Sequence, residues 1–262
     1  MNLFIIENNL LEVQKYLEAG VDTIFIDLEQ LGKEIRQKNL DSVKSKHHVD
    51  DIKLIKTKSN AKVLVRVDPI NPKSRDQINK CIDNGADEIL LPYFTKRKEV
   101  EDFMNIVGGR IKSGLLFEHI EALNDYKFII SQFKPEYVHL GLNDLSLSLK
   151  LKFMFSSLFH EGVEDFCSYC HFSELKFGIG GIGPLRGSGL INGEKILLEY
   201  IRLGASSTIL SRSFKNKFKS TEELREEISK IKKVYTSKPK DEKLKVNYLQ
   251  LKSQCQKIEK LV

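Results

Sequence analysis

A local pattern that occurs three times along the chain constrains its fold more than any other feature. Each time, an amphipathic stretch ends at a glycine and a short apolar run follows, at residues 19–27, 84–92 and 203–211. A glycine after a helix permits the left-handed turn that leads the chain into a strand. Gly20, Gly85 and Gly204 are 65 and 119 positions apart, which corresponds to two and then four βα units of about 30 residues each.

Eight short apolar runs fit this spacing, at residues 3–6, 23–27, 62–67, 88–92, 114–117, 137–141, 177–182 and 207–211. Continuous apolar runs are typical of parallel strands that are buried on both faces. Amphipathic segments such as residues 10–17 alternate with them. Strict alternation with eight strands predicts an α/β protein with a closed (β/α)8 TIM-barrel fold. An open doubly wound sheet is the rival, but it normally has a Gly-rich turn after its first strand, and residues 6–9 contain no glycine.

The length of 262 residues suits one barrel of this kind. We expect residues 1–214 to form the barrel body. Residues 215–262 would then provide the last barrel helix, near residues 221–235, and an extra C-terminal helix near residues 241–261. This extension either belongs to the same domain or forms an oligomer contact. An apolar-rich insertion at residues 146–160 is either a lid or a subunit contact.

The net charge of +6 is concentrated near the C-terminus. Residues 213–262 contain 14 Lys+Arg and 7 Asp+Glu, a balance of +7, which leaves 28 against 29, or −1, for the rest. No RNA-binding motif accompanies the basic residues, so we expect a solvated helical face and no nucleic-acid partner. No apolar run reaches 18 residues, and Glu7, Glu12 and Lys15 interrupt the N-terminus. With four cysteines in no disulfide-scaffold pattern, we expect a cytoplasmic protein that does not contact a membrane.

Charged residues follow several of the predicted strands. Asp27 and Glu29 follow the second strand, Arg66 the third, Glu118 the fifth and Asp144 the sixth. The active site of a TIM barrel lies at the C-terminal ends of its strands, so these side chains are expected to meet there. Lysines stand instead at strand starts, namely Lys62, Lys112 and Lys176. A Schiff-base mechanism requires a lysine in the pocket and is therefore disfavoured.

Carboxylates that converge on one pocket cannot all ionise unless a cation joins them. Carboxylate oxygens prefer hard ions such as Mg²⁺ or Mn²⁺, and Mg²⁺ typically takes one or two carboxylates together with water and substrate. The alternative is that these acids cap helices or pair with Arg66 and Arg212. The residue types alone leave both interpretations open.

Four segments resemble the HpcH/HpaI aldolase and citrate lyase beta-subunit family: residues 25–29 (FIDLE), 64–67 (LVRV), 116–118 (LFE) with Glu121-Ala122, and 141–146 (GLNDLS). The resemblance extends from about residue 3 to residue 214. Its most specific part is the pair Glu118 and Asp144, 26 residues apart, with Leu-Ser after the aspartate. The resemblance implies that Glu118 and Asp144 ligate Mg²⁺ or Mn²⁺. It also implies that Arg66 holds the oxo and carboxylate end of the substrate.

The activity implied by this resemblance is metal-dependent cleavage or formation of a carbon–carbon bond to pyruvate or a related 2-oxo acid. The metal and Arg66 would flank the oxygen on which enolate charge develops. Asn143 and backbone N–H groups near Gly141 would assist in binding the small oxo-acid substrate. A homo-oligomer with the C-terminal helices as its contact is a further implication.

The chain departs from the family pattern at two positions. Gln30 stands where pyruvate aldolases carry a histidine that serves as a base, and Leu116 stands where many members carry a glutamine. The catalytic base could therefore be Asp27, Glu29 or a water held by the metal, and the sequence does not distinguish among them. Two other functions also stay open: a barrel that binds an oxo acid or sugar acid without cleaving it, and an enzyme that acts on phosphoenolpyruvate.

Several further motifs are given less weight. Residues 32–36 resemble a family stretch in which Arg36 either pairs with Glu29 or is plain scaffold. Residues 167–171 (CSYCH) match a haem-attachment pattern, but the segment is expected to be the helix before the seventh strand. His47-His48 is interpreted as a solvated loop. His119 is expected to face away from the pocket. The Gly-rich turn at residues 178–183 is either an anion cradle or a tight connection.

Overall fold

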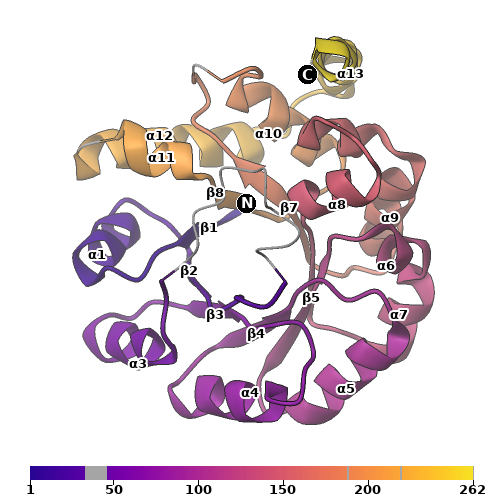
Figure 1. Ribbon diagram of the computed structural model, residues 1–262. Helices are drawn as coiled ribbons and strands as arrows, with labels where there is room; N and C mark the ends of the chain where they lie inside the picture. The colour runs from indigo at the N-terminus through magenta and orange to yellow at the C-terminus, as the bar shows by residue number, and fades with distance from the viewer. Residues whose placement is uncertain (33–45, 188, 219, 262) are drawn as a thin grey trace.

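The strands of the protein close into one barrel. The computed structural model describes residues 1–32, 46–187, 189–218 and 220–261. Each strand pairs in parallel with the next in sequence order, and β8 closes the barrel onto β1 (Figure 1). Helices surround the strands, and one further helix follows at the C-terminus. The predicted (β/α)8 barrel with an extra C-terminal helix is therefore confirmed.

All eight predicted strands are present, with ends within two residues of the expected positions. They are β1 (Asn2–Ile6), β2 (Thr23–Asp27), β3 (Val63–Arg66), β4 (Glu88–Leu91), β5 (Lys112–Phe117), β6 (Tyr137–Leu140), β7 (Phe177–Ile182) and β8 (Ser207–Leu210).

The helices that follow the strands in the described ranges are α1 (Leu10–Glu18), α3 (Val49–Lys58), α4 (Ser74–Asp83), α5 (Arg97–Val107), α6 (Ile120–Asn124), α7 (Tyr126–Phe133), α8 (Leu142–Ser148), the 3₁₀ helix η1 (Met154–Phe159), α9 (Glu161–Phe172), α10 (Gly193–Arg202), α11 (Arg212–Lys217), α12 (Thr221–Thr236) and α13 (Asp241–Leu261). Among them, no helix is both long and apolar enough to span a bilayer.

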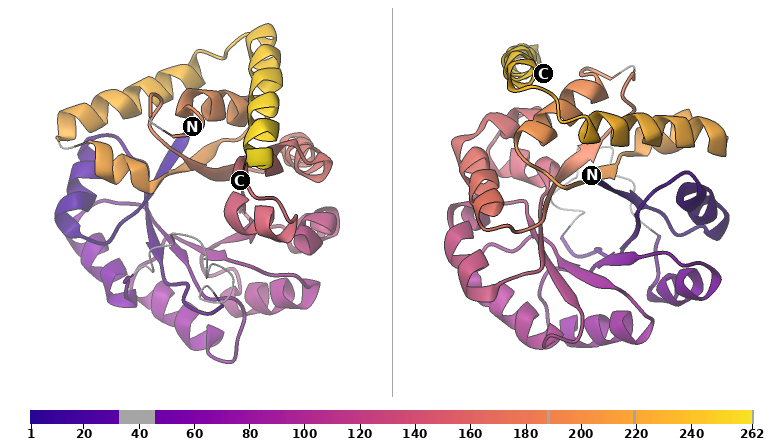
Figure 2. Two further views of the ribbon diagram at one scale, coloured as in Figure 1. Left: turned by 45° about the horizontal axis from the view of Figure 1, so that its top comes forward. Right: turned by 180° about the vertical axis from the view of Figure 1, so that it is seen from behind.

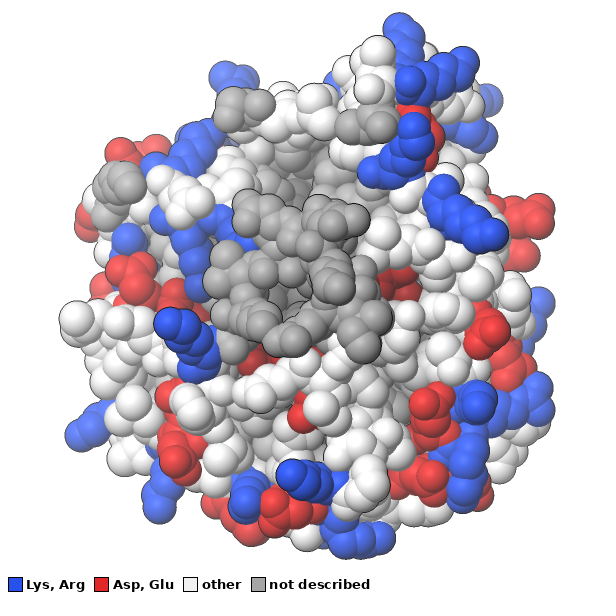
Figure 3. Space-filling model, viewed as in Figure 1, with Lys and Arg blue, Asp and Glu red and all other residues white. Residues whose placement is uncertain are grey.

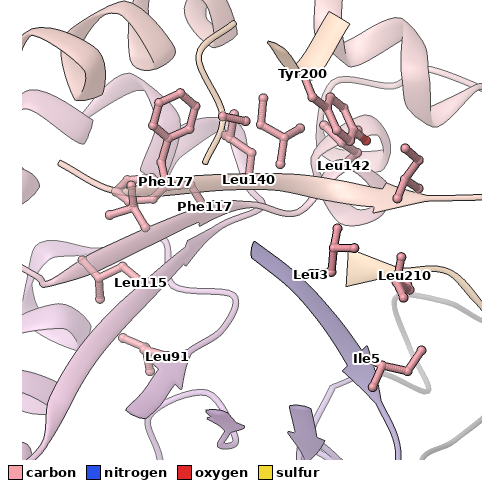
Figure 4. Packing of buried hydrophobic residues seen from close by; sticks show 14 of the residues in the cluster. Leu3, Ile5, Leu91, Leu115, Phe117, Leu140, Leu142, Phe177, Tyr200 and Leu210 are labelled. Carbon is pink, nitrogen blue, oxygen red and sulfur yellow. The ribbon is translucent and has the colours of Figure 1, made fainter. Parts of the chain in front are cut away.

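Alternation along each strand divides the apolar residues into two separate cores, because successive side chains of a strand point to opposite faces. The large outer core contains every second strand residue, for example Leu115 and Phe117, packed with helix residues such as Leu142 and Tyr200 (Figure 4). The small inner core fills the barrel with the residues between them: Phe4, Phe25, Leu64, Leu90, Leu116 and Tyr137. Leu116 therefore forms part of an apolar floor inside the barrel.

A hydrogen-bonded chain of three buried side chains lies beside this inner core. The His139 Nε2 lies 3.2 Å from the carbonyl oxygen of Gly180, and its Nδ1 lies 2.5 Å from the Tyr137 hydroxyl. A carbonyl oxygen can only accept, so Nε2 carries a proton. In a neutral imidazole Nδ1 accepts from the Tyr137 hydroxyl, whose oxygen also lies 3.0 Å from the Ser207 hydroxyl. Burial of the His139 ring favours this neutral form.

This neutral histidine predicts a loss of stability in weak acid. Burial lowers the pKa of His139 from 6.5 to about 4, with Arg66 adding to the effect. Below pH 6.5 the His139 imidazole becomes protonated in the unfolded chain but stays neutral in the folded chain, so the free energy of unfolding falls until about pH 4. The difference between 6.5 and about 4 corresponds to about 3 kcal/mol. Chemical denaturation of the wild type at several pH values should show this decline.

The matched variants for this prediction are His139→Gln and His171→Gln, because His171 is an exposed histidine. In the first variant the decline in unfolding free energy between pH 6.5 and pH 4 should be smaller than in the wild type by about 3 kcal/mol, whatever its stability at pH 7, and the part due to the buried His47 should remain. The second should keep the wild-type decline. An unchanged decline in His139→Gln would contradict the assignment.

The C-terminal helix α13 packs along α10 and η1 of its own chain (Figure 2). The Asn247 side chain donates to the Lys195 carbonyl over 3.0 Å, and the Glu259 carboxylate accepts from the Phe153 N–H over 3.1 Å and from the Ser156 hydroxyl over 2.7 Å. The insertion at residues 146–160, which contains η1, is thus tied to the last helix of the same chain. An oligomer contact through α13 remains a prediction.

Candidate active site

Three of the predicted site residues point into the barrel, because each lies two positions beyond a member of the inner core. Asp27 follows Phe25, Arg66 follows Leu64, and Glu118 follows Leu116. Asp27 and Arg66 are also register partners on the adjacent strands β2 and β3. Strand geometry alone thus brings an arginine and two carboxylates to the C-terminal end of the barrel, above the apolar floor.

Arg66 is bound by two buried carboxylates. Its Nε donates to Asp27 Oδ1 over 3.0 Å and its Nη2 donates to Asp27 Oδ2 over 2.9 Å, a two-point contact that fixes the plane of the guanidinium. Its Nη1 lies 3.2 Å from Glu29 Oε2, an ion pair without hydrogen-bond geometry. Asp27 and Glu29 are 5% and 3% exposed, so this ion-pair cluster is screened little by water.

Burial opposes the charge of Arg66, but its acidic neighbours outweigh that effect. Attraction to Asp27 and Glu29, with a contribution from Glu118, raises the pKa of Arg66 above its ordinary value. Arg66 therefore stays charged at any accessible pH. The contribution from Glu118 places that carboxylate within electrostatic reach of the guanidinium.

Glu118 is held by main chain on two sides. Its Oε1 accepts from the Tyr93 N–H over 2.9 Å. A Cβ at Gly141 would lie 2.7 Å from its Oε2, so that oxygen occupies the space that any other residue at position 141 would fill. Glu118 itself is only 3% exposed. Its carboxylate is thus directed to the start of α8.

That same helix start carries the remaining predicted residues. Asp144, in the first turn of α8, is 4% exposed, and Gly141 is the residue that precedes the helix. The Gly141 N–H donates to the Phe117 carbonyl over 3.0 Å. This N–H, which was expected to bind the substrate, is therefore already engaged. Asn143 is exposed, and its carbonyl accepts from the Ser146 hydroxyl. The structure thus brings Glu118 next to the turn with Asp144, and leaves the Asn143 side chain at the surface.

The connection after β2 is tied to the end of β3. Asp68 Oδ1 accepts from the Gln30 and Leu31 N–H groups over 2.7 and 2.9 Å, and Gln77 holds the other Asp68 oxygen over 3.0 Å. Gln30 is exposed. Arg36, the expected partner of Glu29, lies outside the described residues.

The interpretation of His47 as a solvated loop residue is wrong. His47 is 8% exposed, and its Nδ1 accepts from the Asp27 N–H over 3.0 Å. Burial lowers the pKa of His47 against the attraction of Asp27 and Asp51, so a neutral imidazole lies beside the site. No local sequence pattern predicts this contact, because it joins two residues that are 20 positions apart in the chain.

A lysine also reaches this end of the barrel, from a helix rather than from a strand. Lys215 of α11 pairs with Glu7, just after β1, over 2.8 Å. Glu7 further accepts from the Asn8 and Asn9 N–H groups, and although burial alone would raise its pKa, these partners lower it. The ion pair keeps Lys215 engaged with a carboxylate, which fits poorly with a nucleophilic amine.

The remaining motifs have structural roles. Cys167 and Cys170 are both buried on α9, the helix before β7 as expected, so they face the core. His119 begins α6, where its Nδ1 accepts from the Glu121 N–H. The Gly-rich segment lies almost wholly in β7, where the Gly181 carbonyl accepts from Tyr200 of α10; after the strand, the Leu185 N–H donates to buried Glu227 of α12.

Charged side chains of both signs are present on the described part of the face that carries the C-terminal strand ends (Figure 3). On the face seen in Figure 3, Lys and Arg side chains alternate with Asp and Glu among the described residues, and lysines are prominent on the projecting C-terminal helix. Within the described ranges, no group of three or more His, Cys, Asp or Glu side chains has the arrangement of a metal site.

Residues 1–156 match the family model described as HpcH/HpaI aldolase/citrate lyase. A solved HpcH/HpaI aldolase from Desulfitobacterium hafniense aligns with a TM-score of 0.59 at 16% identity, covering 80% of this chain and 85% of that chain. The citrate synthase SbnG aligns with a TM-score of 0.56 at 16% identity, covering 80% and 84%. At such identities the two structures bear on the fold alone. A comparison with curated proteins gives no match.

Proposed function

Because this chain belongs to the HpcH/HpaI aldolase/citrate lyase family, we propose that it is a divalent-metal-dependent carbon–carbon lyase acting on pyruvate or a related 2-oxo acid. Family membership supports an activity of the aldolase or lyase type. The observation that carries the finer proposal is the arrangement of Arg66, clamped by Asp27 and Glu29, beside the buried Glu118.

The charges of the site favour a cation. Among the described residues, four carboxylates, Asp27, Glu29, Glu118 and Asp144, are buried at or beside the barrel mouth, and the guanidinium of Arg66 pairs with two of them. An anionic substrate would add to this excess of negative charge, and like charges in a buried site cannot all ionise without compensation. A divalent cation resolves the imbalance.

Glu118 and Asp144 fit Mg²⁺ or Mn²⁺ as ligands. Both offer hard oxygen donors, both are almost fully buried, and Gly141 leaves room for Glu118 Oε2 beside the turn that carries Asp144. Two carboxylates are the usual protein contribution to a Mg²⁺ site that also binds substrate. When bound, the ion supplies a Lewis acid to the oxygen on which negative charge develops.

Arg66 would bind and orient the oxo acid. A guanidinium has five N–H donors; Asp27 accepts from two of them, and Glu29 lies 3.2 Å from Nη1 as an ion pair. The N–H groups that Asp27 does not engage are suited to a substrate carboxylate. The apolar floor of Phe25, Leu64, Leu90 and Leu116 excludes water beneath them, which strengthens each electrostatic contact above it.

The direct test is an aldol-cleavage assay on a panel of hydroxylated 2-oxo acids, with pyruvate release as the readout. Protein stripped of metal by a chelator should be inactive, and Mg²⁺ or Mn²⁺ should restore turnover. Unchanged turnover after complete metal removal would refute the proposal.

A second candidate is a barrel that binds an oxo acid or sugar acid without cleaving it. Gln30 favours it, because a carboxamide cannot take a proton and stands exposed where a base is expected. Calorimetric titration with Mg²⁺ and pyruvate separates the two functions, since binding without turnover on the whole panel supports the second. Turnover of phosphoenolpyruvate in the same panel would identify the third possibility.

A further inference from the structure

Tyr93 adopts a backbone conformation that is unusual for an aromatic residue. Its φ is 42°, in the left-handed region, where a side chain with a Cβ is strained. The other described non-glycine residues with positive φ, such as Lys134 with φ 47°, follow helix ends, where this conformation is common. Tyr93 follows the strand β4 instead. Strain at such a place persists only when the surrounding contacts determine it.

Three contacts join this turn to the end of β5. The Tyr93 N–H donates to Glu118 Oε1 over 2.9 Å. Its ring meets the ring of His119 edge to face, with centroids 5.7 Å apart, and the neighbouring Phe94 meets Phe117 in the same way at 5.1 Å. Three successive residues, Phe117, Glu118 and His119, are therefore each contacted by Tyr93 or Phe94. The strained turn is fastened to the segment that carries Glu118.

As a result of these contacts, the two carboxylate oxygens of Glu118 have different neighbours. Oε1 is occupied by the Tyr93 amide, while Oε2 lies against Gly141 at the start of α8, the helix that carries Asp144. We propose that Tyr93 is a positioning residue, whose left-handed main chain fixes the Glu118 carboxylate in the orientation, toward the turn that carries Asp144, that a divalent cation held by these two residues would require. This proposal rests on the function proposed above.

The main-chain amide of Tyr93, and not its phenol side chain, would orient Glu118. Tyr93→Gly keeps the amide and tolerates the left-handed φ without strain. Tyr93→Pro removes the donor and restricts φ to negative values. Partners that orient a metal ligand typically change metal affinity by about 10- to 100-fold when they are lost. We therefore expect Tyr93→Pro to raise the dissociation constant for Mn²⁺ by at least about tenfold, and Tyr93→Gly to change it by less than about threefold.

The experiment measures Mn²⁺ affinity by electron paramagnetic resonance for the wild type, both Tyr93 variants, Glu118→Gln and the control Lys134→Gly. The control relieves a similar backbone strain at the end of α7, away from the site, and should leave Mn²⁺ affinity unchanged. Wild-type affinity in Tyr93→Pro, or an equal loss in Tyr93→Gly, would overturn the role of Tyr93. Wild-type affinity in Glu118→Gln would refute the metal site itself, and the role of Tyr93 with it.

Because Tyr93→Pro places two prolines in succession and could unfold the turn, a second measurement uses the wild-type backbone. The Tyr93 amide proton should resonate downfield in the NMR spectrum of the wild type, as expected for donation to a carboxylate. It should move upfield in Glu118→Gln, where the acceptor is neutral. An amide resonance that is the same in both proteins would overturn the proposal.

Discussion

The Glu118→Gln protein is expected to fold normally and to lose metal-dependent cleavage by about 10³-fold or more. The carboxamide has the size of the carboxylate, and its oxygen can still accept from the Tyr93 N–H. The charge that would hold the cation is gone, however, and so is the Lewis acid it supplies. Asp144→Asn should behave in the same way. Turnover with saturating Mn²⁺, measured beside the melting temperature, separates lost chemistry from lost fold.

The matched control is Glu121→Gln, an exposed acid three positions further along, in the first turn of α6. It removes the same charge from the same connection without touching the carboxylates at the mouth, so activity should stay within about twofold of the wild type. Full metal-dependent activity in Glu118→Gln would contradict its assignment as a ligand.

Replacing Arg66 by Met should produce the largest loss of stability. Asp27 and Glu29 would then remain buried without the guanidinium between them. Breaking a buried ion pair by removing one partner costs about 3–5 kcal/mol, which corresponds to a fall in melting temperature of about 6–20 °C for a chain of this length. Arg66→Lys should be intermediate, because an ammonium cannot make the two-point contact with Asp27.

Two further variants test the physical reason for this loss. Arg97→Met removes a guanidinium paired with Asp125 at the exposed surface, and its melting temperature should stay close to that of the wild type, since exposed pairs contribute little. Combining Arg66→Met with Asp27→Asn and Glu29→Gln removes the stranded charges and should recover much of the stability, but none of the activity. A triple variant as unstable as Arg66→Met would show that lost packing, rather than stranded charge, dominates.

The barrel was predictable because its signal is local and repeated. Short apolar runs at regular spacing, joined by amphipathic segments, identify strands and helices, and the strict order of the elements leaves one closed topology. Membership of the aldolase and citrate lyase family was predictable as well, from short segments around Asp27, Arg66, Glu118 and Asp144. The convergence of Asp27, Arg66 and Glu118 on one end of the barrel follows from strand parity.

The contacts that shape the site were not predictable, because they depend on paths through the connections. His47 reaches the Asp27 amide from 20 residues away, and Tyr93 turns its N–H to Glu118 through a conformation that its residue type does not favour. Gly141 was expected to donate to substrate. In the structure its missing side chain provides room for Glu118, while its N–H binds Phe117. A sequence shows the glycine but not which neighbour approaches it.

The most direct test of the account is a crystal of the wild-type protein soaked with Mn²⁺ and pyruvate, with data collected at a wavelength where manganese scatters anomalously. We predict one anomalous peak per chain, within about 2.0–2.4 Å of Glu118 Oε2 and an Asp144 carboxylate oxygen, with pyruvate between the ion and Arg66. The account would be contradicted if no anomalous peak appeared at the barrel mouth while Mn²⁺ bound elsewhere on the protein at high occupancy. It would also be contradicted if Glu118 and Asp144 pointed to separate protein partners.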